Sequence, residues 1–334
     1  MSLPVGKLPS VALERLLRLC REDPRVIVRA GVGQDAAALA FGDQVVVAKT
    51  DPITFATDRI GWYAVNINAN DVACLGATPR FFLAAVLLPE GSASEAMAEG
   101  IFRDLAASCE ALDVTLCGGH TEVTYGLPRP IVVGHMLGDV TRDRLVENRR
   151  SQPGDDVLLT KGIAIEGTAL IAREKGAELA GVLDAAVLDR ARRFLEQPGL
   201  SVVRDAKAIC DAIRPHALHD PTEGGLATGL HELADAAGLG VAVDAEAIAV
   251  FPETAALCRH YGLDPLGLIA SGALLAVTAP ADTAAALDAL SRAGVAAARI
   301  GCMVERQEGV ALRRGGRPEP LPRFDSDEVA RLFA

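Results

Sequence analysis

Hydrophobic positions recur along the chain with two different periods. Between residues 93 and 112 the apolar side chains are spaced three or four apart, which predicts a helix with one buried face. Short apolar runs at 44–50, 81–88 and 131–140 predict strands instead. Because the two patterns alternate as far as residue 304, the sequence predicts a mixed α/β protein. Further helices are expected from Ser10 onward and at 60–76, 165–175, 187–195, 202–213, 225–237 and 281–293, and further strands at 36–40, 114–117, 157–160, 241–243, 274–278 and 297–304.

A polar stretch near the middle of the chain separates two such halves. Residues 148–156 read N-R-R-S-Q-P-G-D-D and contain a Pro-Gly turn signal. With 334 residues the chain is long enough for two domains of ordinary size. We therefore predict one domain over 1–150 and a second over 151–334.

Composition and charge exclude several classes of protein. The net charge is −11, whereas a nucleic-acid-binding protein requires a basic surface. No apolar run reaches the roughly eighteen residues of a membrane span, and the first ten residues lack the pattern of a signal peptide. The seven cysteines are scattered without a C-x-x-C pair. That distribution argues against structural zinc and a disulfide framework, and it favours a reducing cytoplasm.

Candidate chemistry gathers where acidic and amide side chains adjoin apolar segments, mostly in Gly-rich turns. Magnesium prefers hard oxygen ligands, and one or two carboxylates plus phosphate oxygens suffice for each ion. Gly-rich turns and helix N-termini expose backbone N–H groups that favour phosphate. Together these features predict a site for magnesium and nucleotide phosphate. The five segments are 31–38, 49–51, 66–71, 118–122 and 219–225.

Several of these residues also have a purely structural interpretation. Asp35 follows a G-x-G and could be an ordinary turn residue. His120 could be a buried core histidine, and Glu122 a surface acid. The segment 66–71 is harder to explain in that way, because Asn and Asp are unfavourable inside helices and four of them fall within six positions.

The segment before helix 225–237 has a structural alternative of its own. Asp220, Pro221 and Glu223 are spaced as a capping box, with Asp220 as N-cap and Pro221 at the first helical position. A dinucleotide-binding enzyme built around the G-x-G at 31–33 is a weaker alternative, because no G-x-G-x-x-G opens a helix here.

Taken together, these segments resemble the AIR synthase-like (PurM-type) superfamily of ATP-using enzymes, over nearly the whole chain. The most specific match is N-I-N-A-N-D-V-A-C-L-G-A-T-P at 66–79, which is similar to the superfamily's N-D-hydrophobic-G-A-x-P segment. L-H-D-P-T-E-G-G-L-A at 218–227 resembles the D-P-T-R-G-G of the HypE-like branch. Further similarity to that branch or to the superfamily lies at 6–9, at 33–37, in G-G-H-T-E at 118–122, in T-K-G-I-A-I-E-G-T at 160–168 and at 271–275.

The resemblance implies a two-domain PurM-like fold whose N-terminal sheet forms part of a homodimer interface. It implies ATP and Mg2+ as cofactors, a small-molecule substrate, and a maturation protein as a candidate partner. The metal ligands it implies are Asp35, Asp51, Asp71, Glu122 and Asp220, and the catalytic residues are Asp35, Asp71 and His120. The nucleotide contacts it implies are Asn68, Gly118, Gly119, Thr121, Lys161, Thr222, Gly224 and Gly225.

The function expected from the resemblance is ATP-dependent phosphoryl transfer to an oxygen of a small amide- or carbamoyl-like substrate. Two alternatives stay open. One is a small-molecule kinase of the thiamine-monophosphate kinase type, in which the phosphate stays on the substrate. The other is a nucleotide-binding maturation factor without catalytic activity.

Three departures from the related branches leave the exact reaction open. HypE ends with a cysteine that carries a carbamoyl group, whereas the last cysteine here is Cys302, inside a predicted strand. We therefore expect that the HypE reaction cannot run in its usual form. His120 stands where other branches carry Asp, and Glu223 stands where HypE has Arg.

Overall fold

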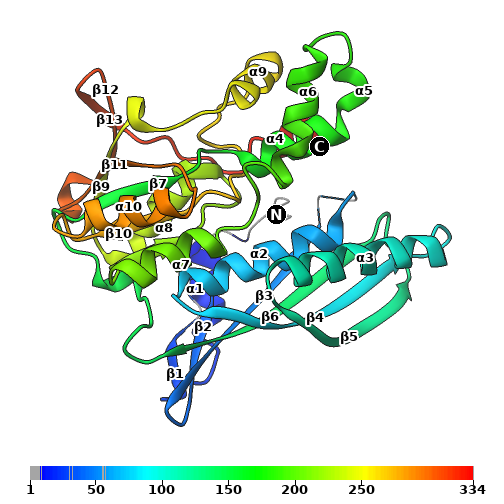
Figure 1. The fold of residues 1–334 in the computed structure, drawn as a ribbon, viewed down its shortest axis with the longest axis horizontal. Helices are drawn as coiled ribbons and strands as arrows, with labels where there is room; N and C mark the ends of the chain where they lie inside the picture. Colours follow the sequence, from blue (N-terminus) through cyan, green and yellow to red (C-terminus); the bar gives the residue numbers. More distant parts are fainter. Residues whose placement is uncertain are drawn as a thin grey trace. The chain divides into compact units, whose positions relative to one another are not determined.

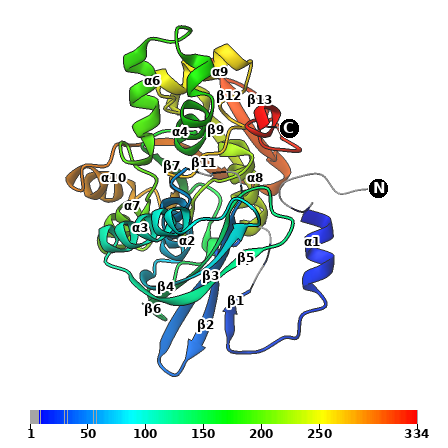
Figure 2. The same ribbon diagram turned by 90° about the vertical axis from the view of Figure 1, so that its right-hand side faces the viewer.

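The structure of the chain is a computed structural model, drawn from two sides in Figures 1 and 2. It describes residues 8, 10–29, 31, 33–54, 56 and 58–333. Two segments singled out in the sequence, 6–9 and the G-x-G at 31–33, lie partly outside the described residues. No helix within the described ranges is long and apolar enough to cross a membrane.

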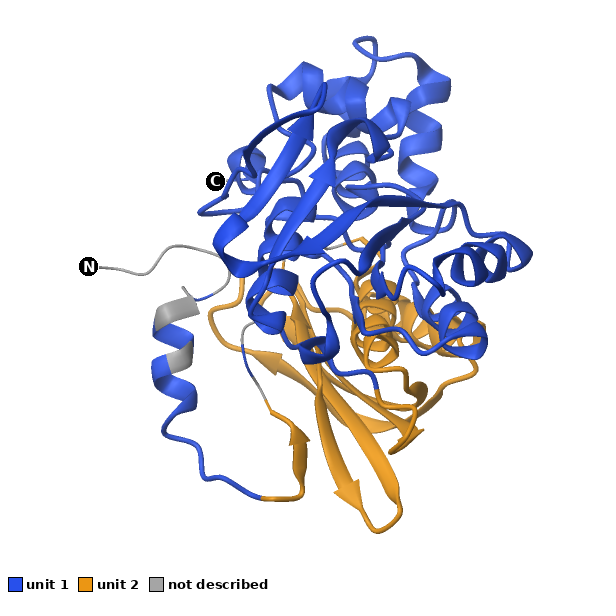
Figure 3. Cartoon of the chain, turned by 90° about the vertical axis from the view of Figure 1, so that its left-hand side faces the viewer, with its two compact units in different colours: residues 1–23, 30–34, 146–334 blue, residues 24–29, 35–145 orange. Residues whose placement is uncertain are grey.

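The chain forms two compact units, shown in different colours in Figure 3. The N-terminal unit contains residues 24–29 and 35–145, and the C-terminal unit contains 1–23, 30–34 and 146–334. The main change from one unit to the other falls between Leu145 and Val146, near the expected boundary at 150. The short segments 1–23 and 30–34 group with the C-terminal unit, a detail that the two-domain prediction did not contain.

The N-terminal unit is a six-stranded sheet with two helices. Its strand order is β1-β2-β3-β6-β4-β5, and only the β4–β5 pair is parallel. Both helices lie on the same face of this sheet (Figures 1 and 2). The elements are β1 (Val26–Val28), β2 (Ala37–Phe41), β3 (Gln44–Ile53), α2 (Ile60–Cys74), β4 (Thr78–Pro89), α3 (Glu95–Ala111), β5 (Thr115–Thr124) and β6 (Ile131–Thr141).

The alternation of buried and exposed residues identifies the two faces of this sheet. Phe82 is fully buried beneath the helices, whereas its neighbour Phe81 is 50% exposed on the other face. Strand β6 alternates in the same way along nearly its whole length. Successive side chains of a strand point to opposite faces, so the sheet has a helix-covered face and an open face within this unit.

Helix α2, which the sequence predicts over 60–76, is buried on nearly all sides. All of its residues except Trp62 are buried, including the polar side chains of Asn66, Asn68 and Asp71. Gly61 permits close packing on α3, since a Cβ atom there would lie 2.6 Å from the carbonyl oxygen of Ile101. The polar side chains of this helix therefore lie inside the unit and not on its surface.

The C-terminal unit is built on a seven-stranded sheet of order β13-β12-β9-β11-β7-β10-β8. Only the β9–β12 pair is parallel. Its strands are β7 (Asp156–Thr160), β8 (Ala217–His219), β9 (Gly240–Asp244), β10 (Leu275–Thr278), β11 (Ala297–Val304), β12 (Val310–Arg314) and β13 (Arg317–Pro320). Its helices are α1 (Ser10–Leu17), α4 (Ile165–Glu174), α5 (Gly176–Leu179), α6 (Ala185–Arg192), α7 (Val203–Ala212), α8 (Gly225–Ala237), α9 (Pro252–Tyr261), α10 (Thr283–Arg292) and α11 (Ala330–Phe333), with 3-10 turns η1 (Asn148–Arg150), η2 (Arg193–Leu195), η3 (Ala245–Ala247) and η4 (Arg306–Glu308).

The helix predicted over 225–237 is confirmed as α8. Leu226, Leu230 and Leu233 are fully buried and belong to the main core of this unit, together with residues of β7, β9 and β10. Helix α8 begins at Gly225 and ends at Ala237, as the periodicity indicated. The loop before this helix carries Asp220.

Candidate functional site

In the N-terminal unit, three of the predicted acidic residues surround a lysine. Lys49 and Asp51 are two apart on β3 and therefore point to the same face of the sheet. The Nζ atom of Lys49 lies 3.2 Å from Oδ2 of Asp51 and 3.1 Å from Oδ2 of Asp71, which α2 supplies. Strand and helix thus bring together two carboxylates that are twenty residues apart in the sequence.

The electrostatics of Lys49 place Asp35 in the same cluster. Burial opposes the positive charge, but the carboxylates of Asp71, Asp51 and Asp35, in that order of strength, outweigh it and hold the pKa of Lys49 above its ordinary value. Asp35 is itself 7% exposed. Three carboxylates around one ammonium leave a net charge of about −2, which is the charge that one divalent cation neutralises.

Asn68 lies beside this cluster and carries an acceptor that is not used within the described chain. Its Nδ2 donates to the carbonyl oxygen of Ala64 at 2.8 Å and to that of Asp51 at 3.3 Å. Its Oδ1 is buried and has no hydrogen-bond partner among the described residues. A buried acceptor without a partner is costly, so this oxygen is suited to a metal ion, a water molecule or a ligand donor.

The orientation of Asn68 depends on a glycine of the facing strand. Gly134 of β6 lies opposite the amide, and a Cβ atom there would collide with Nδ2 of Asn68 and with the ring of Phe82.

By contrast, Asn66 has a structural role, because its Nδ2 donates to the carbonyl oxygen of Trp62 and to Oγ of Ser108 on α3. The polar segment of α2 therefore combines residues that hold the helix with residues that face the carboxylate cluster.

The glycines at 118 and 119 do not form the turn predicted from the sequence. Both lie inside β5, which continues to Thr124. Gly119 is needed there because a Cβ atom would collide with the backbone of Ala84 on the neighbouring strand. The predicted Gly-rich turn was wrong, and close packing of two strands accounts for Gly119. Their predicted contact with nucleotide stays a prediction.

His120 and Glu122 lie on the open face of the sheet. In the strand register, Asp51, Gly134, Ala84 and Gly119 form one row across the sheet, and this row points toward the helices. His120 is one residue further along β5, so it and Glu122 point to the opposite face. Within one copy of the chain, these two side chains therefore do not meet the cluster around Lys49.

The two side chains instead contact each other in solvent. Nε2 of His120 and Oε2 of Glu122 are 3.1 Å apart, and the Thr124 hydroxyl donates to the other carboxylate oxygen at 2.9 Å. These hydrogen bonds, first from His120 and then from Thr124, lower the pKa of Glu122. His120 is exposed, so its interpretation as a core histidine was wrong. Thr121 lies between these two residues on β5 and pairs with Val86 of β4. Its side chain therefore points to the face of the sheet that the helices cover.

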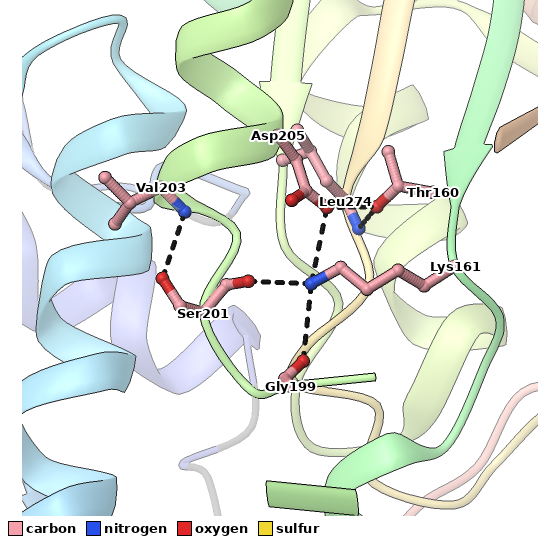
Figure 4. Close-up of polar contacts among 7 residues, drawn as sticks. All are labelled: Thr160, Lys161, Gly199, Ser201, Val203, Asp205 and Leu274. Atoms are coloured by element: carbon pink, nitrogen blue, oxygen red, sulfur yellow. Dashed lines mark hydrogen bonds and ion pairs between the residues drawn. The ribbon is translucent and has the colours of Figure 1, made fainter. Parts of the chain in front are cut away.

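In the C-terminal unit, Lys161 is held by acceptors of its own unit (Figure 4). Its ammonium donates to the carbonyl oxygens of Ser201 at 2.7 Å and Gly199 at 3.3 Å, and it pairs with Oδ2 of Asp205 at 3.3 Å. Burial lowers the pKa of Lys161, and Asp205 opposes that effect. Because these three acceptors match the three donors of an ammonium group, the structure assigns Lys161 a bracing role, and its predicted contact with nucleotide stays a prediction.

The loop that carries Asp220 is not the capping box considered above. Asp220 is 1% exposed, and the N-cap of α8 is Gly224, which has no side-chain cap. Gly224 and Gly225 have φ angles of 77° and 65°, in the left-handed region that favours glycine. Side chains there would also collide with Thr228 and with the backbone at Leu266. Helix capping therefore does not explain the buried carboxylate of Asp220.

Three sequence segments that carry the family resemblance meet in this unit. The N–H of Ala270 donates to the carbonyl oxygen of Thr222 at 3.2 Å. The N–H of Gly167 donates to Ile269, and that of Glu166 donates to Ser271. The segments 160–168, 218–227 and 271–275 are thus joined through the backbone around residues 269–271. Asp220, Thr222, Gly224 and Gly225 all belong to this region, and their predicted contacts with metal and nucleotide stay predictions.

Comparisons with known proteins agree with this architecture. The chain matches the N-terminal domain of AIR synthase related protein over residues 33–140 and its C-terminal domain over 152–313. It is 31% identical over 288 residues to carbamoyl dehydratase HypE of Cupriavidus necator, covering 83% of this chain and 78% of that protein. It is 26% identical over 296 residues to a putative hydrogenase expression/formation protein of Methanocaldococcus jannaschii, covering 85% of each. The chain therefore belongs to the AIR synthase-related proteins. Within them, it is of the HypE type.

Solved structures share the fold. A HypE–HypF complex matches with a TM-score of 0.74 at 22% identity, over 93% of this chain and 99% of that chain. HypE in complex with ATP matches with a TM-score of 0.72 at 23% identity, over 98% of each chain. AaThiL complexed with AMPPCP and TMP matches with a TM-score of 0.74 at 18% identity, over 96% of this chain and 98% of that chain. The predicted PurM-like two-domain α/β fold is confirmed.

Proposed function

We propose that the chain is an ATP-dependent enzyme of the HypE type that phosphorylates an oxygen of a small amide- or carbamoyl-like substrate. The observation that carries the proposal is the carboxylate cluster around Lys49, next to an unused buried oxygen of Asn68. The relationship to carbamoyl dehydratase HypE supports the substrate class. The shared fold of HypE in complex with ATP supports the cofactor.

The residues of the N-terminal unit fit a magnesium ion. Asp35, Asp51 and Asp71 would hold it, and Oδ1 of Asn68 offers a neutral oxygen beside them. When bound, Mg2+ neutralises negative charge on phosphate oxygens during phosphoryl transfer. We assign Asp220 to the same chemistry as a residue of the C-terminal unit, on the basis of its burial and its motif.

The chain's own residues act by position and charge, because phosphoryl transfer needs little covalent chemistry from the protein. In this proposal Lys49 neutralises part of the carboxylate charge and presents an ammonium group to phosphate. Asn68 is fixed by Ala64 and Gly134 and orients a bound water or phosphate oxygen. Asp35 and Asp71 keep the catalytic roles that the resemblance implies.

We further propose a homodimer formed through the open face of the N-terminal sheet. Phe81, on that face, is a large apolar side chain and is 50% exposed. Strand β5 ends the described sheet and leaves one edge for pairing. In such a dimer, His120 and Glu122 would belong to the interface or to a site shared by two copies. Light scattering on the wild type and on Phe81→Asp checks this, and a wild type that is monomeric at micromolar concentration removes the proposal.

A maturation partner is also proposed, since HypE has been solved in complex with HypF. Cys302 lies in β11 and is half-buried, as expected from the sequence. Co-purification from the native host and mass spectrometry of the bound proteins would identify the partner.

The central test is ATP hydrolysis by variants of the carboxylate cluster. Asp35→Asn and Asp71→Asn are expected to abolish Mg-dependent ATP turnover and the rise in melting temperature that Mg-ATP produces in the wild type. Asp43→Asn, in an exposed turn of the same unit, is the matched control and should keep both. Full activity in both cluster variants contradicts the proposal. Phosphorus NMR separates the kinase alternative, in which phosphate remains on the product.

A further inference from the structure

The last described residues form a strap over the C-terminal unit. We call residues 321–333 the C-terminal strap. Leu321 and Val329 are 3% and 1% exposed, and a Cβ atom at Gly267 would lie 2.5 Å from the ring of Phe324. The N–H of Glu328 donates to the carbonyl oxygen of Gly267 at 3.1 Å. The strap is therefore packed against the segment that precedes β10.

One carboxylate of the strap holds two other segments. Oδ2 of Asp327 accepts from the N–H of Gly224 at 2.7 Å, and Oδ1 accepts from Ile269 at 3.2 Å and from Val329 at 2.8 Å. Asp327 is 9% exposed, so these bonds lie away from bulk water. A carboxylate with three backbone donors is a strong and directional anchor.

The loop that ends at Gly224 depends on such an anchor. Gly224 is the N-cap of α8, provides no side-chain cap and is followed by a second left-handed glycine. Glycine loses the most conformational freedom on folding, so two in succession are costly to hold in one conformation. The acceptor for the Gly224 N–H is a side chain 103 residues further along the chain. The local sequence therefore does not fix this loop by itself.

The second segment held by Asp327, around Ile269, is hydrogen-bonded to the other segments that carry the family resemblance. Ile269 donates its N–H to Asp327 and accepts from Gly167 at 3.1 Å through its carbonyl oxygen. Its neighbour Ala270 donates to Thr222. Asp327 thus contacts both sides of the junction at which segments 160–168, 218–227 and 271–275 meet.

We propose that Asp327 is a positioning residue, which fixes the 220–225 loop so that Asp220, Thr222 and Gly224 are preorganised for nucleotide and metal. The positioning of the loop by Asp327 does not depend on the proposed function. Only its consequence for nucleotide and metal binding rests on that proposal. The chemistry of Asp327 is that of a buried anion that accepts the N–H of Gly224, the N-cap residue of α8, which has no acceptor within the helix. The role belongs to a residue outside every segment that carries the family resemblance.

Hydrogen exchange tests the positioning without any ligand. Asp327→Asn keeps the volume and one acceptor, but it leaves the Gly224 N–H facing an amide group or an uncharged oxygen. We expect exchange in the 220–226 peptide to accelerate about tenfold, while β7 stays as protected as in the wild type. Asp325→Asn removes an exposed acid of the same strap and should change neither peptide. Unchanged exchange at 220–226 in Asp327→Asn overturns the inference, whatever the chain binds.

Nucleotide binding and kinetics test the consequence. With Asp327→Asn we expect Mg-ATP affinity to fall about tenfold and KM to rise by a similar factor, and Asp327→Glu, which retains the charge, should recover part of the loss. If Asp327→Asn does not fold, the Mg-ATP affinity of Asp327→Glu is compared with that of Asp325→Asn instead. Asp327→Glu should then bind less tightly than Asp325→Asn, because it recovers only part of the loss. Normal affinity in a variant whose loop exchanges faster overturns the functional part. If the wild type does not bind ATP, the proposed function is contradicted. The hydrogen-exchange result still tests whether Asp327 positions the loop.

Discussion

The Nζ atom of Lys49 lies 3.1 Å from Oδ2 of Asp71, and this contact joins strand β3 to helix α2. Asp71 is almost fully buried, and Lys49 is mostly buried. Removing one member of such a pair leaves the other charge without compensation, which costs more than the pair contributes. The contact therefore has consequences for both stability and metal binding.

Lys49→Met should destabilise the N-terminal unit when divalent ions are absent. Because Asp35, Asp51 and Asp71 then repel one another, we expect the free energy of unfolding to fall by about 3 kcal/mol. Added Mg2+ should recover much of this loss and should stabilise the variant more than the wild type. Chemical denaturation with and without Mg2+ measures both. Lys207→Met, which removes an exposed partner of Asp211, is the control and should cost under about 1 kcal/mol.

Gly134→Ala should reduce ATP turnover through Asn68. The new methyl group collides with the Asn68 amide and with Phe82, so the amide must move. A displacement of about 1 Å near the reacting groups can lower the rate by roughly 100-fold. Steady-state hydrolysis checks this. Gly100→Ala lies in α3 with no atom within 4 Å of the new methyl group, and it should be as active as the wild type and slightly more stable. Equal activity of the two variants would refute the proposed role of Asn68.

Lys161→Met should unfold the C-terminal unit more easily, because Asp205 would lose its buried partner. We expect a loss of about 3 kcal/mol, and a smaller loss in the double variant Lys161→Met/Asp205→Asn. A double-mutant cycle from denaturation curves measures the coupling. Additive losses would contradict the bracing role. A variant of normal stability that no longer binds ATP would support the nucleotide contact expected from the sequence.

The stability contributed by Asp327 should fall as the pH rises. The pKa of Asp327 is raised from 3.8 to about 6, mainly by burial and to a smaller extent by Glu223, against the opposing effect of its three backbone hydrogen bonds. The folded chain then binds this proton more tightly than the unfolded chain. The contribution is fully present below the unfolded value near 3.8 and is lost as the pH rises through about 6. Over that interval, the stability of the wild type relative to Asp327→Asn should decrease by up to roughly 3 kcal/mol. A difference that grows with pH would contradict this assignment.

The periodic elements of the fold could be predicted from the sequence, whereas elements set by tertiary contacts could not. Helix α8 was predicted with the bounds that the structure has, because Leu226, Leu230 and Leu233 give an unambiguous stripe. Strand β5 was predicted to end at residue 117, since Gly118 and Gly119 weaken any local strand signal. Pairing with β4 extends it to Thr124, an effect that no local window contains.

The candidate site was partly predictable for a similar reason. Asp35, Asp51 and Asp71 stood out as acids beside apolar segments, and the structure brings them to one lysine. Lys49 was not predicted as a site residue, although its spacing of two from Asp51 places both on one face of a strand. Asp327 gave no signal at all, because its role depends on backbone donors more than fifty residues away.

The lysine among the carboxylates of the N-terminal unit gives the protein a resident positive charge where its ligand ion is proposed to bind. Magnesium then binds to carboxylates whose charge is already partly compensated, so the unit does not need the ion to hold them together. Chelators should strip the ion without collapsing the unit, and the apparent affinity for magnesium should be modest. Such a protein would sense the supply of nucleotide-bound metal more than the supply of free metal.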